Sequence, residues 1–176
     1  MSVHTGLLTV EEFQKLPEPK EGHIELHHGE VTFMPPAKRG HQRIQRRILA
    51  LLTGLAGKEG VVETEMAFRP APEHEVWVAD VGYIKLDRDQ ATADDEYLTN
   101  SPNLVVEVLS PGNTVDEINE KISLCMTTGC SSFWVVDPKR KLVSVTEGKL
   151  TTHFRPPDNI SCNAFPGQVP VGDIFE

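Results

Sequence analysis

Hydrophobic and polar residues alternate along the chain in two different periods. Residues from about 40 to 56 carry apolar side chains every three or four positions, which predicts an amphipathic helix. Residues from about 115 to 128 repeat the pattern and end before Gly129, a typical helix stop. The predicted apolar stripes consist of Ile44, Ile48, Leu51, Leu52 and Leu55 in the first helix, and of Val115, Ile118, Ile122 and Cys125 in the second.

A short helix is predicted near the N-terminus, because Thr9 and Glu12 have the spacing of a capping box. Pro17 and Pro19 would end it. Period-two or continuous apolar runs predict strands in the rest of the chain. We expect strands at 24–33, as a hairpin around His28-Gly29, at 61–68, 76–86, 104–109 and 133–136, and as a second hairpin over 142–154 around Glu147-Gly148.

Two segments show no clear period. Residues 87–97 are acidic and predict an irregular, solvated loop. The tail after residue 155 is rich in Pro and Gly. The order of the remaining elements predicts an α/β protein of the mixed α+β kind, with helices packed on the faces of a central mixed sheet. We find no boundary that divides the chain, so residues 1–176 are expected to form a single domain.

The composition excludes several classes of protein. The 176 residues are 39% hydrophobic and 24% charged, which is a normal globular balance. Three cysteines without CxxC spacing argue against a disulfide framework or a zinc site. We recognise no signal peptide, membrane span, GxSxG motif or phosphate-binding P-loop, and a cytoplasmic location is the expectation.

Two acidic residues lie inside apolar runs that otherwise predict buried strands. Asp80 lies within the apolar run VWVADVGYI and Glu107 within LVVEVL. A buried carboxylate is costly unless it is paired or binds a cation, and hard cations such as Mg²⁺ prefer oxygen ligands. Neighbouring strands lie about 5 Å apart, so the two acids could converge on one metal. A structural ion pair, or a strand end that faces water, is the alternative.

The predicted helix at 40–56 begins with a basic cluster, although the net charge of the chain is -9. Such a local stripe suits phosphate groups. His41, at the start of the helix, could contact phosphate or metal, or act only as a helix cap. The alternative for the stripe is a solvated helix face whose cations pair with acids of the chain itself. The basic residues are Lys38, Arg39, Arg43, Arg46 and Arg47.

Several motifs in sequence order resemble the Uma-two family, a bacterial domain of unknown function with a restriction-endonuclease-like fold. The most similar stretch runs from Glu107 to Pro138, and IELHHGE, His41-Gln42-Arg43, Ala79-Asp80-Val81 and the Thr9 to Glu18 segment extend the similarity to nearly the whole chain. The chain departs from the family pattern at Ala79, at Cys125-Met126 and at Ser132. The matching residues of the main stretch are Glu107, Ser110, Pro111, Asp116, Lys121, Gly129, Trp134, Asp137 and Pro138.

The resemblance implies a site of the PD-(D/E)XK nuclease type. Asp80 and Glu107 would hold Mg²⁺ or Mn²⁺, and Glu25 would add a third acid to the metal site. The usual lysine position, two residues after the glutamate, is Leu109 here. The nearest replacement is Lys121, which lies three residues after Ile118 and four before Cys125 and so borders the apolar stripe of its helix, from where it could lean back toward Glu107. An ordinary solvated lysine is the alternative. A homodimer is also an expectation by resemblance.

The expected function is therefore metal-dependent hydrolysis of phosphodiester bonds in nucleic acid, with DNA favoured over RNA. A catalytically inactive binding or dimerisation module on the same fold is the first alternative. It would be favoured by a solvent-exposed Lys121, or by a Glu107 paired with an internal cation. A phosphoesterase acting on a smaller substrate is the second alternative, and a narrow closed pocket would favour it.

Overall fold

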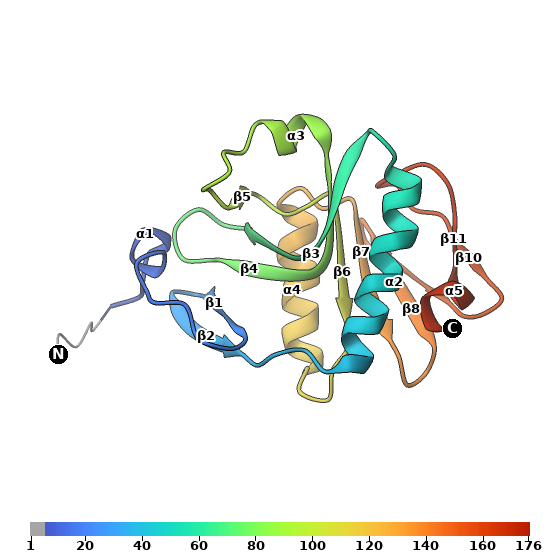
Figure 1. Cartoon of the computed structure of the whole chain (residues 1–176), viewed down its shortest axis with the longest axis horizontal. Coiled ribbons are helices and arrows are strands. Elements are labelled where there is room, and N and C mark those ends of the chain that lie inside the picture. The colour runs from blue at the N-terminus through green and yellow to red at the C-terminus, as the bar shows by residue number, and fades with distance from the viewer. Residues whose placement is uncertain (1–5) are drawn as a thin grey trace.

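The computed structural model describes residues 6–176 and confirms the mixed α/β architecture (Figure 1). Five helices and eleven strands are present in this range. The helices are α1 (Val10–Phe13), α2 (Arg39–Ala56), α3 (Leu86–Gln90), α4 (Val115–Thr127) and α5 (Val171–Phe175). The strands are β1 (His23–His27), β2 (Glu30–Met34), β3 (Gly60–Arg69), β4 (Trp77–Lys85), β5 (Leu98–Thr99), β6 (Leu104–Val108), β7 (Ser132–Asp137), β8 (Leu142–Glu147), β9 (Leu150–Phe154), β10 (Asn159–Ile160) and β11 (Val169–Pro170).

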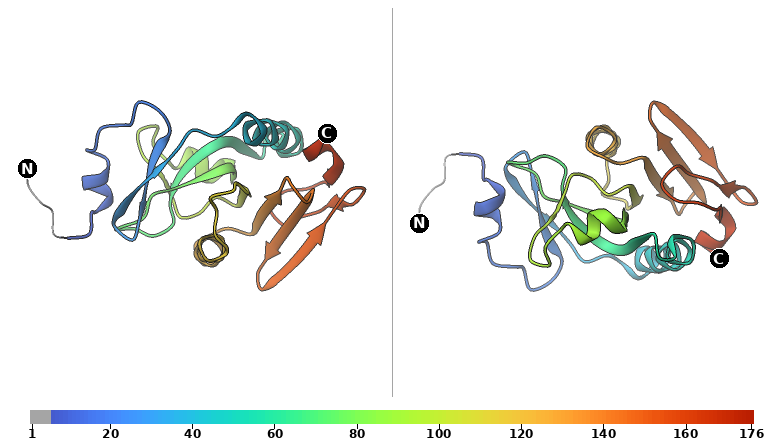
Figure 2. Two further views of the ribbon diagram at one scale, coloured as in Figure 1. Left: turned by 90° about the horizontal axis from the view of Figure 1, so that it is seen from below. Right: turned by 90° about the horizontal axis from the view of Figure 1, so that it is seen from above.

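Seven strands form the central sheet in the order β5-β3-β4-β6-β7-β8-β9. Two of the pairings, β3 with β5 and β6 with β7, are parallel and the others are antiparallel. Helices α2 and α4 cover opposite faces of the sheet (Figure 2). The parallel pair β6–β7 is connected through α4, which is the usual crossover between parallel strands.

The hydrophobic core has one part on each face of this sheet. Alternate residues of β6 point to opposite faces, so Val106 and Val108 pack with α2 and the C-terminal segment, whereas Val105 packs on the α4 side. Every residue of β6 is buried. Burying one such aliphatic side chain stabilises the fold by roughly 1.5–3 kcal/mol before entropy is counted, which explains why the central strand reads as a continuous apolar run.

The predicted helix starts and the first hairpin are confirmed. The Thr9 side chain accepts a hydrogen bond from the Glu12 backbone, and Glu12 reciprocates. Thr114 forms the same capping box for α4. His28 and Gly29 connect β1 and β2 with positive φ angles of 52° and 76°, as a tight two-residue hairpin turn requires.

Two structural expectations are wrong, and the tail forms elements for which no prediction was made. Residues 87–97 are not an irregular loop throughout, because α3 begins at Leu86 and β5 follows at Leu98–Thr99. The tail forms β10, β11 and α5, and their apolar residues complete the core beside α2. Val115 is 75% exposed and does not belong to the buried stripe of α4. Short elements of this kind are stabilised by tertiary packing, so no periodic pattern identifies them.

Candidate functional site

The site is built where strands β4 and β6 separate. The two strands pair through three residue pairs that end at Val81 and Val106, just before Asp80. Beyond this point the backbone groups find side-chain partners. The Val108 N–H donates to Asp80 Oδ2 at 2.7 Å, and the Val78 carbonyl accepts a hydrogen bond from Lys121 Nζ at 2.8 Å. At these two backbone groups the site side chains take the place of ladder partners.

The backbone of β3 is also irregular next to the site. Thr64 pairs with Val81 and Met66 pairs with Ala79, and between them Glu65 has a φ of 53°. A positive φ is uncommon for a residue other than glycine. The irregular residue of β3 therefore lies beside Asp80 in the register, and its carboxylate joins the groove described below.

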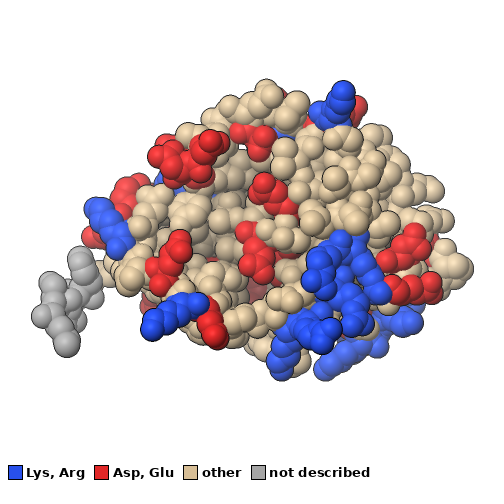
Figure 3. Space-filling model, in the orientation of Figure 1, with Lys and Arg blue, Asp and Glu red and all other residues tan. Residues whose placement is uncertain are grey.

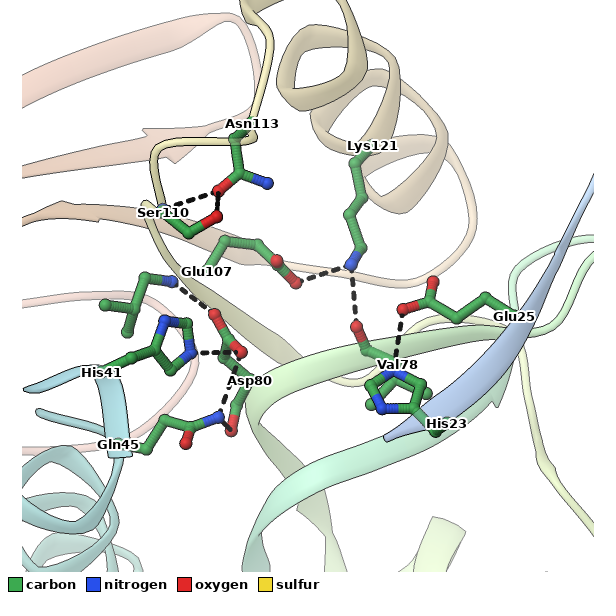
Figure 4. A network of polar contacts seen from close by, with 11 residues as sticks. His23, Glu25, His41, Gln45, Val78, Asp80, Glu107, Ser110, Asn113 and Lys121 are labelled. Carbon is green, nitrogen blue, oxygen red and sulfur yellow. Dashed lines mark hydrogen bonds and ion pairs between the residues drawn. The ribbon is translucent and has the colours of Figure 1, made fainter. Parts of the chain in front are cut away.

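Asp80 is held by three donors. His41 Nε2 donates to Asp80 Oδ1 at 2.8 Å, and Gln45 Nε2 donates to the same oxygen at 3.0 Å. Both donors come from one face of α2, four residues apart, and the third is the Val108 N–H. Figure 4 shows the His41 and Gln45 side chains directed at this carboxylate. Asp80 is therefore oriented before any ligand binds.

Glu107 has a different environment. Its side chain is 11% exposed and its Oε1 lies 2.8 Å from the ammonium of Lys121, which is 12% exposed. The contact has the length of a hydrogen bond but not its angles, so within residues 6–176 the buried Oε1 receives no hydrogen bond. Lys121 thus points inward, as the resemblance implies, and neutralises Glu107 mainly by charge (Figure 4).

Glu25 approaches the same region from β1. Its side chain is 2% exposed and lies between two histidines of its own strand. His23 Nε2 and His27 Nε2 donate to the two carboxylate oxygens at 3.2 and 2.9 Å. These residues alternate along β1, so all three point to one face. The histidines hold the carboxylate of Glu25, and its charge acts on Lys121.

The site shifts the pKa values of its acids in opposite directions, up for Glu107 and down for Glu25. Burial raises the pKa of Glu107 to about 7, and the negative charge of Asp80 adds to the effect while Lys121 opposes it. Burial opposes charge on Lys121, but the negative charges of Glu107 and Glu25 prevail and raise the pKa of its ammonium. A raised lysine pKa means that the cation stays charged at neutral pH.

Glu25 stays ionised in spite of its burial. Burial alone would raise its pKa, but the charge of Lys121 and the hydrogen bonds from His23 and His27 lower the pKa of Glu25 to about 2. For His41, burial lowers the pKa of the imidazole, but the hydrogen bond to Asp80 and the negative charges of Asp80, Glu107 and Glu65 together outweigh it, and the net pKa is raised. Opposite shifts clustered in one cleft are typical of functional sites.

The donor set of Asp80 and Glu107 suits a hard divalent cation. Both supply hard carboxylate oxygens, and Glu107 Oε1 is a buried acceptor without a hydrogen bond in the described part of the chain. In residues 6–176 no three His, Cys, Asp or Glu side chains already form a metal-binding group. Mg²⁺ commonly uses only one or two carboxylates and completes its shell with water and phosphate oxygens, so two converging acids are sufficient.

An open groove passes over the site. The acids Glu25, Asp80 and Glu107 line it together with Lys121. Of the cations predicted on α2, Lys38, Arg43 and Arg47 also line the groove, as does His41. Arg39 and Arg46 are exposed on the same helix but do not line it. Among the described residues, none of the five α2 cations has an acid within 4.0 Å, which removes internal pairing as an explanation for the stripe.

Several contributors were not predicted. Gln45 is 4% exposed although it is polar, and a buried glutamine on an apolar helix face was the available signal. His23 and His27 carried a period-two signal around Glu25. Lys139, Arg140 and Lys141 line the groove from the β7–β8 turn, which follows the Asp137-Pro138 motif. Only the fold shows that this turn lies near α2.

The sheet, its covering helices and the paired carboxylates beside a buried lysine define an α/β protein of the nuclease-like class. The chain belongs to the Uma2 family, described as "Putative restriction endonuclease", which matches residues 10–171. The fold is similar to the crystal structure of a "putative nuclease belonging to DUF820" from Anabaena variabilis ATCC 29413, with a TM-score of 0.81 and 21% identity over 96% of this chain and 97% of that one. No curated protein matches the chain. No helix in residues 6–176 is long and apolar enough to cross a membrane.

Proposed function

We propose that the chain is a divalent-metal-dependent nuclease that hydrolyses phosphodiester bonds, with DNA as the favoured substrate. The observation that carries the proposal is the geometry around Glu107. A buried, charged Lys121 lies 2.8 Å from the carboxylate of Glu107, and Glu107, Lys121 and Asp80 line the same open groove. The family description, a restriction endonuclease, supports DNA over RNA.

In the proposed reaction a water oxygen bonds to phosphorus, the bond to one sugar oxygen breaks, and the leaving oxygen gains a proton. Mg²⁺ or Mn²⁺ held by Asp80 and Glu107 would lower the pKa of a bound water and offset phosphate charge. Lys121 holds a positive charge where the phosphorane charge develops. Glu25 keeps that lysine charged, and His41 with Gln45 keeps Asp80 oriented.

A second candidate function is a catalytically inactive binding or dimerisation module. One observation favours it: Glu107 is already paired with the internal cation Lys121. In that case the ion pair would be structural, and Asp80 would serve mainly to join α2 to β6. The open groove argues against a phosphoesterase with a narrow, closed pocket for a smaller substrate.

The test is cleavage of single-stranded, duplex and branched DNA and RNA with Mg²⁺ or Mn²⁺. Wild-type protein, Glu107→Gln and the control Glu63→Gln, an exposed acid of β3 outside the groove, would be compared. We expect metal-dependent cleavage by the wild type and the control, and at least a hundredfold loss in Glu107→Gln. Absence of cleavage by the wild type on every substrate with both metals would contradict the nuclease and favour the binding module.

A further inference from the structure

The groove receives cations from two elements that lie far apart in the sequence. Lys38, Arg43 and Arg47 come from the start of α2, and the turn between β7 and β8 adds three more. The turn residues Lys139, Arg140 and Lys141 are all exposed. We call these three the turn cations. Together with Lys121, seven of the 17 Lys and Arg residues line one groove on a chain whose net charge is -9.

The backbone of the turn is held in a defined shape. Asp137 Oδ1 accepts hydrogen bonds from the backbone N–H groups of Lys139 and Arg140, at 2.9 and 3.0 Å. Lys141 has a φ of 47°, which reverses the chain into β8. Of the turn cations, only Arg140 has an acid within 4.0 Å in the described range, Asp137 at 3.3 Å. Lys139 and Lys141 are therefore free to bind an external anion.

The two ends of the groove differ in charge. The end formed by β1 and β3 contributes Glu25, Glu65 and His23 to the lining, and no Lys or Arg. The groove cations other than Lys121 come from α2 and from the β7–β8 turn, and this turn lies beyond β6 in the sheet order. Figure 3 shows Lys and Arg grouped over the N-terminal half of α2 at the lower right, whereas Asp and Glu prevail at the centre and upper left of this face.

We propose that the turn cations, together with Lys38, Arg43 and Arg47 from the start of α2, bind the phosphates of a nucleic acid on the β7 side of Glu107. This inference rests on the proposed function for its ligand. Glu107 pairs with Val135 of β7, and the turn begins after Asp137. Adjacent strands lie about 5 Å apart and each residue advances about 3.3 Å along a strand, so the turn begins about 10 Å from Glu107. Successive phosphates of one strand advance about 3.4 Å along the duplex axis, and a bound strand therefore spans this distance within about three nucleotides.

The experiment measures binding of a fluorescein-labelled 20-base-pair DNA duplex, and of the matching single strand, by anisotropy without divalent metal over a range of salt. The turn variant carries Lys139→Ala, Arg140→Ala and Lys141→Asn, because asparagine tolerates a positive φ. The control variant carries Lys15→Ala, Lys58→Ala and Lys149→Ala. These are exposed lysines outside the groove, and their loss changes the net charge equally. An Arg43→Ala, Arg47→Ala variant tests the α2 side.

We expect the turn variant to bind about 10- to 500-fold more weakly in 0.1 M salt, with the slope of log K against log salt less steep by about 2 to 3. The α2 variant should lose about two phosphate contacts in the same way, and the control should keep the wild-type slope. If the turn variant has a lowered unfolding midpoint, the double variant Lys139→Gln, Arg140→Gln replaces it, because it leaves Lys141, the residue with the positive φ, unchanged.

The outcomes separate this inference from the nuclease proposal. A turn variant that binds like the control would overturn the inference, even if the wild type cleaves DNA. Wild-type binding that depends on the turn, without cleavage in Mg²⁺ or Mn²⁺, would support the inference and contradict the nuclease. A wild type that binds neither probe overturns the inference directly.

Discussion

Asp80 and Glu107 lie on neighbouring strands, yet the protein satisfies the two carboxylates in different ways. Asp80 is 21% exposed and accepts hydrogen bonds from His41, Gln45 and the Val108 backbone. Glu107 is nearly buried, and Lys121 compensates it by charge. Hydrogen bonds fix the direction of a carboxylate, whereas an ion pair mainly fixes its charge. Asp80 is thus the oriented ligand of the pair, and Glu107 is the acid whose ionisation depends on a nearby cation.

The largest loss of folding stability is expected when the positive charge of Lys121 beside Glu107 is removed. Lys121→Met leaves a buried carboxylate without a counter-charge, and breaking a buried pair in this way costs about 3–5 kcal/mol. The pKa of Glu107 is already raised above its ordinary 4.5, to about 7. Its protonated form therefore fits the fold best, and stability is lost as pH rises through this window. We expect Lys121→Met to be mildly destabilised at pH 5 and strongly destabilised at pH 8, as measured by urea unfolding.

The double variant Lys121→Met, Glu107→Gln is the control for that prediction. With no charge left in the pair, its free energy of unfolding should recover by at least about 2 kcal/mol relative to Lys121→Met at pH 8. Equal destabilisation of the single and the double variant would show that Lys121 contributes packing alone, for example against Trp77, whose ring centroid lies 6.0 Å from its Nζ.

An intermediate loss of folding stability is expected when Glu25 is replaced, because its negative charge helps to keep Lys121 charged. Its folded pKa is about 2 against an ordinary 4.5. The stability it contributes is therefore fully present above pH 4.5 and lost as pH falls toward 2. This corresponds to about 3 kcal/mol, at about 1.4 kcal/mol for each pKa unit.

Thermal unfolding of wild type and Glu25→Gln between pH 7 and pH 2.5 measures this contribution. The gap in stability should be widest at neutral pH and should narrow below pH 4.5. Glu30→Gln, an exposed acid in the same hairpin, should show no such change. A gap that stays constant down to pH 2.5 would refute a stabilising charge on Glu25.

The smallest effect on metal binding is expected when one donor to Asp80 is removed, because the other two donors still orient the carboxylate. Gln45→Ala removes one of three donors, which costs about 1 kcal/mol. His41 and the Val108 N–H still orient the carboxylate. Isothermal titration with Mg²⁺ should therefore show less than tenfold weakening, and Gln42→Ala, an exposed neighbour, should match the wild type. A loss as large as that in Asp80→Asn would show that Gln45 is essential for orienting Asp80.

The sequence by itself determined the elements whose burial follows a simple period. The stripe from Ile44 to Leu55 predicted α2, the run LVVEVL predicted β6, and His28-Gly29 predicted the first hairpin. The same logic singled out Asp80 and Glu107, because an acid inside an apolar run is conspicuous. Lys121 borders the apolar stripe of its helix, which allowed it to lean toward Glu107, and the family resemblance gave it a role. The place of Glu25 in the site came from the resemblance alone.

Tertiary structure alone decided how these residues meet. The separation of β4 from β6, the position of the turn cations beside α2, and the approach of Glu25 to Lys121 depend on contacts between distant segments. Local periodicity reports which face of an element is buried, but not which element covers it. Short elements such as α3, β5 and α5 escape prediction for the same reason, because their stability comes from the surfaces they pack against.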